Sequence, residues 1–291
     1  MGKILELALR SDVMNHAWNF MKKDRGLWRR GLPLAEMQRD VIRHVGELGE
    51  AVRNGSYRPE AMRCFEVDKA DGGKRTLCAS VVRDKLLQRA LLLAAEPLGE
   101  AIFHPWSYGY RPQCSVQMAV ARLREFVREG YHWLGDADIK SCFDSIPQRA
   151  ALRAFDRLCK DRDATRLVGQ WLSAMPREFL PFGPGIGLPQ GMVLSPFLCN
   201  LYLHEMDLEL QRKGVPFVRF ADDFVVLGRS EAAAQKALKM AERRLEKLSL
   251  RLHPEKTRVV RSSPRYRFLG ERMPDANKGQ RRVSLLQRVF A

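Results

Sequence analysis

The octapeptide Phe220-Ala221-Asp222-Asp223-Phe224-Val225-Val226-Leu227 carries the most information about the fold. We interpret residues 215–227 as an apolar β-hairpin that is interrupted only by Asp222 and Asp223. A buried carboxylate without a partner is very costly, so these two acids must be exposed at the turn or neutralised by cations. A plain Asp-Asp hairpin turn would give the same octapeptide, so this stretch alone leaves the function open.

A second pair of acids lies in Asp136-Ala137-Asp138, within an expected strand from Tyr131 to Ile139. Side chains alternate along a strand, so Asp136 and Asp138 share one face, and Asp138 falls at the end of the strand. For Asp138 alone, a solvent-facing acid is the commoner explanation. Two sets of carboxylates that meet at a sheet edge are nevertheless typical of phosphoryl transfer by two metal ions. Magnesium accepts one or two carboxylates and completes its shell with substrate phosphate oxygens.

The order of elements from residue 131 onward is strand, helices, hairpin, helix and strand, which predicts an α+β fold with a ferredoxin-like split βαβ sheet. Many unrelated domains share this plan. Before it, residues 61–80 predict a hairpin that turns at Asp71-Gly72-Gly73. The remaining expected elements are helices at about 81–101, 115–130, 148–175, 191–213 and 231–248, and a last hairpin at about 266–285.

Composition indicates a polyanionic partner. Lys and Arg number 50 against 34 acids, which gives a net charge of +16 and a pI of about 9.9; nucleic acid is the simplest partner for such a chain, although a basic but ordinary enzyme has the same balance. No stretch approaches the roughly 18 apolar residues of a membrane helix, so no membrane partner is expected. The six cysteines are scattered, which argues against a zinc site and predicts reduced, mostly buried thiols in a cytoplasmic protein.

Several motifs occur in an order that resembles the reverse transcriptases of group II introns and their bacterial relatives, over about residues 50–270. Phe220-Ala221-Asp222-Asp223 stands where that family usually has Tyr-Ala-Asp-Asp. The other matching motifs are Ser107-Tyr108-Gly109-Tyr110-Arg111-Pro112, Asp138 to Ile146, Leu188 to Pro196 with its Q-G-x-x-x-S-P pattern, Lys256-Thr257, and Phe268-Leu269-Gly270.

The resemblance implies a right-hand polymerase with fingers and palm. Residues 1–130 would form the fingers region with an N-terminal helical extension, and residues 131–275 the palm, with a helical fingers insertion at about 148–185. Residues 276–291 would be a C-terminal stub, with the thumb absent or vestigial, so that a protein or RNA partner could replace the thumb. One departure is Arg75-Thr76-Leu77-Cys78-Ala79-Ser80, which replaces the usual R-P-L-G-I-P of the fingers.

The resemblance also assigns catalytic roles. Asp138 and Asp222 would bridge two Mg²⁺ ions, with Mn²⁺ as an alternative, while Asp223 would sit beside them in a secondary role. The backbone carbonyl of Ile139 would also reach a metal. Lys256 would donate a proton to the pyrophosphate leaving group, although a plain surface lysine is the alternative.

The remaining assigned residues would bind substrates. Phe143 would exclude a ribose 2′-hydroxyl and so favour dNTPs, against a simple packing role. Gln190 would contact the incoming nucleotide, against a role as helix N-cap, and Gly191 would let the backbone approach it closely. The basic candidates are Lys69 and Arg75 for the triphosphate and Arg111 for the template or nucleotide; for these, a solvated surface position is the alternative.

These assignments together predict an RNA-dependent DNA polymerase that extends a DNA or RNA primer on an RNA template with dNTPs. One alternative is a nucleotidyl transferase that works without a template or copies RNA into RNA. Another is a nucleic-acid-binding subunit whose catalysis is dormant. The sequence leaves the pathway open between CRISPR adaptation, other phage defence and a shortened intron protein.

Overall fold

The computed structural model describes residues 1–68 and 72–276. The chain forms two compact units, and each unit takes two segments of the sequence. The first unit comprises Met1–Ile102 and Phe143–Tyr202, and the second comprises Phe103–Cys142 and the chain from Leu203 onward. The expected division into a fingers region (1–130) and a palm (131–275) with a helical fingers insertion at about 148–185 stays a prediction.

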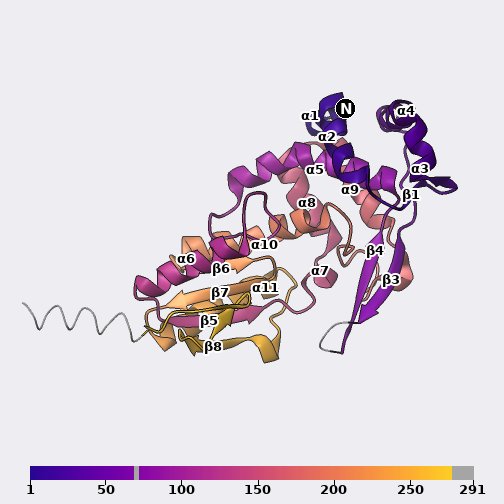
Figure 1. Ribbon diagram of the computed structural model, residues 1–291. Coiled ribbons are helices and arrows are strands. Elements are labelled where there is room, and N and C mark those ends of the chain that lie inside the picture. Colours follow the sequence, from indigo (N-terminus) through magenta and orange to yellow (C-terminus); the bar gives the residue numbers. More distant parts are fainter. Residues whose placement is uncertain (69–71, 277–291) are drawn as a thin grey trace, which may run out of the picture. The chain divides into compact units, whose positions relative to one another are not determined.

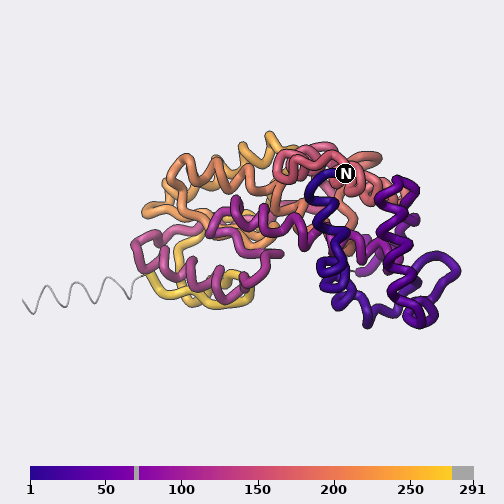
Figure 2. Tube along the Cα trace, turned by 90° about the horizontal axis from the view of Figure 1, so that it is seen from above, coloured from indigo at the N-terminus to yellow at the C-terminus, as the bar shows by residue number. Residues whose placement is uncertain are grey.

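The first unit is mainly helical and is organised around α5 (Val82–Ile102). Leu86, Ala90 and Leu91 of α5 are fully buried, and the N-terminal helices α1 (Lys3–Ala8) and α2 (Ser11–Met21), drawn in indigo in Figure 2, pack against α5. The other elements of this unit are β1 (Leu27–Arg29), β2 (Leu32–Pro33), α3 (Leu34–Met37), α4 (Val41–Arg53), α8 (Gln148–Cys159) and α9 (Arg162–Ser173), with short 3-10 turns at Gln38–Asp40 and Arg177–Phe179.

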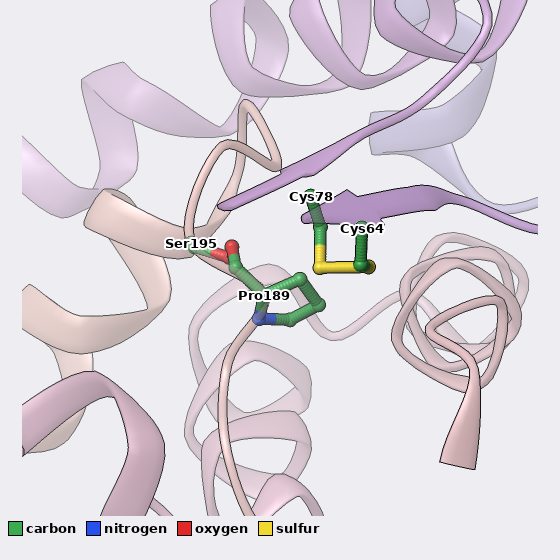
Figure 3. The surroundings of a disulfide bond; sticks show 4 residues. All are labelled: Cys64, Cys78, Pro189 and Ser195. Atoms are coloured by element: carbon green, nitrogen blue, oxygen red, sulfur yellow. A yellow bond between two sulfur atoms is a disulfide. The ribbon is translucent and has the colours of Figure 1, made fainter. Parts of the chain in front are cut away.

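The expected hairpin at 61–80 is present as β3 (Arg63–Asp68) and β4 (Lys74–Ala79). Its register places Cys64 directly opposite Cys78, and the two cysteines form a disulfide (Figure 3). The expectation of reduced thiols is therefore wrong for this pair, because cross-strand register is not visible in the spacing of the two residues. The other four cysteines form no disulfide, and Cys142, Cys159 and Cys199 are buried as expected.

The second unit contains a four-stranded antiparallel sheet in the order β6-β7-β5-β8, which runs from top to bottom in Figure 1. In chain order this is the arrangement expected of a split βαβ plan, because β5 lies between β7 and β8. The strands are β5 (Trp133–Asp138), β6 (Phe217–Phe220), β7 (Asp223–Gly228) and β8 (Arg258–Arg261).

Opposite faces of this sheet are covered differently. Leu134, Val225 and Leu227 pack with α6 (Val116–Arg128) in one buried cluster. On the other face, glycines allow α11 (Glu231–Lys247) to approach closely, since a Cβ at Gly228 would lie 2.4 Å from the backbone nitrogen of Ala234. Asp136 and Asp138 follow the alternation of Leu134 and therefore lie on the α6 face.

The helix expected from residue 191 begins later, at α10 (Ser195–Arg212), because Gly191 has a left-handed backbone with φ of +108°. This helix starts in the first unit and ends in the second. Ser230 caps α11, and its hydroxyl accepts a hydrogen bond from the N–H of Ala233. In the last hairpin, β9 (Arg267–Phe268) pairs with β10 (Glu271–Arg272), and the part from residue 277 lies outside the described residues. No described helix is long and apolar enough to span a bilayer.

Candidate active site

The acids of the two carboxylate motifs meet at one end of the sheet in the second unit. In the register of β5 and β7, Asp138 is the direct partner of Asp223. Asp222 immediately precedes β7, in the turn between β6 and β7. The predicted juxtaposition of Asp138 with the Asp222-Asp223 turn is therefore present in the geometry of this one sheet.

The charges at this end of the sheet are unbalanced toward negative. Partial loss of hydration and, after it, repulsion from the carboxylates of Asp222, Asp138 and Asp136 together raise the pKa of Asp223 to about 6. Lys256 opposes this shift and places its Nζ 2.9 Å from Oδ2 of Asp138. A carboxylate group that resists full ionisation in this way is suited to a cation.

Asp136 has a different environment from Asp138 although they share a face. The Tyr266 hydroxyl donates to Asp136 Oδ1 at 2.9 Å, and Arg258 Nε lies 3.5 Å from Oδ2. Burial raises the pKa of Asp136, while these two partners lower it. Asp136 is therefore engaged by protein partners, and Asp138 remains at the edge with Lys256.

The residues present can be tested as ligands for divalent metal ions. Among the described residues, no three His, Cys, Asp or Glu side chains form a ready metal cluster. Oxygen donors at Asp138, Asp222 and Asp223 are nevertheless the type that Mg²⁺ prefers, and substrate phosphates normally complete such a site. Ile139 follows Asp138 at the end of β5, and its side chain is buried. A β-bridge between Ile139 and Leu252 fixes the backbone at this point. The oxygen atoms of Asp138, Asp222 and Asp223 therefore fit divalent metal ions.

The turn that carries Asp222 is held by residues that the sequence analysis missed. Ala221 has a left-handed backbone with φ of +60°, and Arg219 Nη1 donates to its carbonyl at 3.0 Å. The Arg219 guanidinium is fully buried and also makes a bidentate pair with Asp207, at 2.9 and 2.6 Å. An arginine inside the apolar run 215–227 was the available signal, since a charge in such a strand requires a buried partner.

The segment around Ser107-Tyr108-Gly109 also supports this turn. The N–H of Tyr108 donates to the carbonyl of Arg219, and the N–H of Arg219 donates to the carbonyl of Trp106. A Cβ at Gly109 would lie 2.2 Å from the backbone nitrogen of Ala221. Only glycine therefore allows this backbone contact, which gives the Ser107–Pro112 motif a structural purpose in the second unit.

Arg111 of the same motif is turned toward its own segment. Its Nη1 donates to the carbonyls of His104 and Ser107 at 2.9 and 2.5 Å, and its guanidinium lies 5.5 Å from the centre of the Phe103 ring. These partners order the segment from Phe103 to Arg111. A contact of Arg111 with template or nucleotide stays a prediction.

Three of the predicted substrate-binding residues come together within the first unit. Gln190 donates from Nε2 to Asp144 Oδ1 at 3.0 Å, and its carbonyl accepts from the N–H of Cys78 at 2.7 Å. Phe143 precedes Asp144, and its carbonyl accepts from Leu188. Since α10 begins at Ser195, Gln190 is not the N-cap of that helix.

Gly191 lies against the hairpin of this unit. A Cβ there would come within 2.3 Å of the Cys78 carbonyl oxygen, and the Cys64–Cys78 disulfide lies beside Pro189 and Ser195 (Figure 3). Arg75 is exposed on β4, opposite Val67, and Lys69 lies outside the described residues. Phe143, Gln190, Gly191 and Arg75 thus belong to the first unit, and the carboxylates, Lys256 and Arg111 to the second.

Comparison with known proteins identifies the family of this chain. The family model described as reverse transcriptase (RNA-dependent DNA polymerase) matches residues 67–273. The chain therefore belongs to the reverse transcriptase family.

The chain is also similar to individual proteins. Protein YkfC of Escherichia coli K12 is 28% identical over 78% of this chain and 70% of its own length. The group II intron-encoded protein LtrA of Lactococcus lactis is 30% identical over 72% of this chain, which corresponds to 36% of LtrA. A solved structure of apo telomerase from Candida tropicalis has a similar fold, with a TM-score of 0.55 at 15% identity, covering 77% of this chain and 57% of that one.

Proposed function

We propose that this chain is a reverse transcriptase that extends a DNA or RNA primer on an RNA template with dNTPs. The observation that carries the proposal is the pairing of Asp138 with Asp223 in the register of β5 and β7, because it brings the carboxylates of two separate motifs to one sheet edge. Membership of the family supports the reaction class. The net charge of +16 supports a nucleic-acid substrate.

In this proposal Asp138 and Asp222 hold two Mg²⁺ ions, or Mn²⁺, with Asp223 and the Ile139 carbonyl beside them. When bound, such ions activate the primer 3′-hydroxyl and stabilise the leaving pyrophosphate. Lys256 is now paired with Asp138, and we assign it as the proton donor to the leaving group. Arg258 and Tyr266 hold Asp136, so the ligand set excludes Asp136.

The nucleotide-binding residues are proposed from the first unit. Phe143 would select against the ribose 2′-hydroxyl, and its position next to Asp144 connects it to Gln190. Gly191 would keep the backbone open to the nucleotide, while Arg75 and Lys69 would bind the triphosphate. The β3–β4 hairpin then belongs to the fingers and the four-stranded sheet to the palm.

The test is primer extension on an RNA oligonucleotide with dNTPs and Mg²⁺, comparing the parent protein with Asp222→Asn. This variant removes one charge and keeps the side-chain volume. Glu242→Gln, on the exposed side of α11, is the matched control for loss of one acid. We expect template-dependent DNA synthesis by the parent and the control, and loss of at least about a hundredfold in Asp222→Asn, since electrostatic stabilisation by one such group is worth that much.

Other outcomes separate the alternatives. Primer extension whose product does not depend on the template sequence would indicate a template-independent transferase. A preference for rNTPs over dNTPs would indicate that the protein copies RNA into RNA. Binding of the oligonucleotide without any synthesis under Mg²⁺ or Mn²⁺ would refute the proposal in favour of a dormant binding subunit.

A further inference from the structure

A groove of about 620 Å³ lies in the second unit between the C-terminal part of α10 and the outer side of α11. Its lining carries six cationic side chains and one carboxylate, that of Glu209, and its only sizeable apolar side chain is Met240. The cationic side chains are Lys213, Lys236, Lys239, Arg243, Arg244 and Lys247. This groove is distinct from the candidate active site and is not needed to explain it.

The groove lies across the sheet from the carboxylates. Gly135 and Gly228 face α11, whereas Asp136 and Asp138 alternate onto the face that packs with α6. The sheet and the thickness of α11 therefore separate the groove from Asp138. The phosphates bound in the groove are therefore not the phosphates that react at the carboxylates.

One wall of the groove is fixed by an ion pair between the helices. Arg244 Nη2 lies 2.6 Å from Glu205 Oε2, and Arg244 Nε donates to the Glu205 carbonyl. Glu209 is the only acid in the lining, and its Oε2 lies 3.3 Å from Arg212 Nη2. Both charges at this junction are therefore engaged with partners on the protein.

The other five cations have no such partner. Within residues 1–68 and 72–276, the structure pairs none of Lys213, Lys236, Lys239, Arg243 and Lys247 with a carboxylate. Lys239, Arg243 and Lys247 are spaced four residues apart on α11, so like charges follow one another on successive turns. That arrangement destabilises a helix by itself, and a polyanion would relieve it.

The dimensions fit the backbone of a nucleic-acid duplex. From Lys236 to Lys247 the helix rises by about 16 Å at 1.5 Å per residue. One strand of a duplex carries one phosphate per about 3.4 Å of the axis, so over the same length it presents roughly five phosphates to the five cations. We propose that this groove binds the phosphate backbone of a nucleic-acid duplex without reading its sequence.

Two other partners fit the lining less well. An acidic protein segment would need apolar anchors at the centre of its interface, and Met240 is the only sizeable candidate. A single strand bound without sequence preference usually stacks its bases on aromatic side chains, and no aromatic residue is among those that line the groove. The lining therefore suits contacts with the phosphates of a duplex, and such contacts position the duplex without specifying its bases.

The experiment compares duplex binding by the full-length parent with that of the triple variant Lys239→Gln, Arg243→Gln, Lys247→Gln. The control, Arg10→Gln, Arg43→Gln, Arg166→Gln, lowers the net charge equally but removes cations that already pair with Asp12, Asp40 and Asp163. Fluorescence anisotropy with a labelled blunt duplex of about 20 base pairs, as DNA and as RNA, is followed between about 50 and 200 mM salt.

For the DNA duplex, we expect the groove variant to lose about three phosphate contacts. The slope of log K against log salt should then become less negative by about 2.7, and affinity at the lowest salt should fall by about tenfold or more. The control should keep the parental slope. Circular dichroism melting curves establish that each variant is folded.

Three outcomes would overturn the proposal: an unchanged slope in the groove variant, an equal change in the control, or competition by a poly-glutamate peptide as effective as by the duplex. The DNA and RNA arms show which duplex binds more tightly. The binding assay needs no catalysis and can be repeated with Asp222→Asn. Failure of the proposed polymerase activity would therefore leave this result standing, and the reverse also holds.

Discussion

Replacing Arg219 by methionine removes the guanidinium that joins Asp207 to the carbonyl of Ala221. Both members of the ion pair are completely buried, so the change leaves the Asp207 carboxylate in the interior without a counter-ion. Loss of one partner of a buried pair typically costs about 3–5 kcal/mol of the free energy of unfolding. Urea unfolding of Arg219→Met against the parent measures this cost directly.

The double variant Arg219→Met, Asp207→Leu separates stability from positioning. Replacing a whole buried pair by apolar residues is often neutral or even stabilising, so we expect the double variant to recover most of the lost stability. It still lacks the hydrogen bond from Arg219 Nη1 to the Ala221 carbonyl, which holds the turn before Asp222. We therefore expect nucleotide incorporation to remain reduced, by up to about a hundredfold for a displacement near 1 Å.

The measurement is single-nucleotide incorporation under saturating primer–template, with Lys substituted at Arg219 as the conservative comparison. Lysine restores the charge but cannot supply the planar fork that bonds two partners. The reasoning about positioning would be refuted if the stable double variant incorporated nucleotides at the parental rate. The reasoning about burial would be refuted if Arg219→Met unfolded at the parental urea midpoint.

Three further outcomes are expected. Gly191→Ala places a Cβ against the Cys78 carbonyl, at a residue whose φ is +108°. The change should lower the free energy of unfolding by at least about 1–2 kcal/mol and raise the KM for dNTPs. Steady-state kinetics that match the parent would contradict this. Cys64→Ser, Cys78→Ser should lower the stability of the oxidised protein by about 3 kcal/mol, the cost of opening a loop of this size; after treatment with dithiothreitol, parent and variant should melt alike. The folded-state pKa of Asp223, about 6, lies above its ordinary value of 3.8; in that interval the folded state binds more protons than the unfolded state, so the metal-free protein should lose stability as pH rises from about 4 to 6. Asp223→Asn should abolish that decline in thermal melts, and an unchanged decline would assign it to another group.

The part of the site that could be predicted from the sequence consists of residues whose role depends on local pattern. Alternation along one strand placed Asp136 and Asp138 on a shared face, and the apolar hairpin placed Asp222 at a turn. The split βαβ order followed from the sequence of elements. The matched motifs then led to the reverse transcriptase family, which the family comparison confirmed.

Interactions between distant residues could not be predicted in the same way. The Cys64–Cys78 disulfide depends on the register of β3 with β4, which the spacing of the two cysteines does not reveal. The Arg219–Asp207 pair joins a strand to the helix before it, and no pattern in either element specifies the other. The start of α10 was placed too early because the positive φ of Gly191 reflects its packing against Cys78. Each of these errors concerns tertiary packing that overrides local propensity.

The backbone bonds between Arg219 and the Trp106–Tyr108 segment have a consequence for solubility. β6 is one of the two edge strands of the sheet, and an edge strand with unpaired amide and carbonyl groups is a template for aggregation. Trp106 and Tyr108 engage those groups of β6 from the outside. A fragment cut to begin at residue 131 would keep all four strands but uncover this margin, so it should self-associate where a fragment beginning at Phe103 would not.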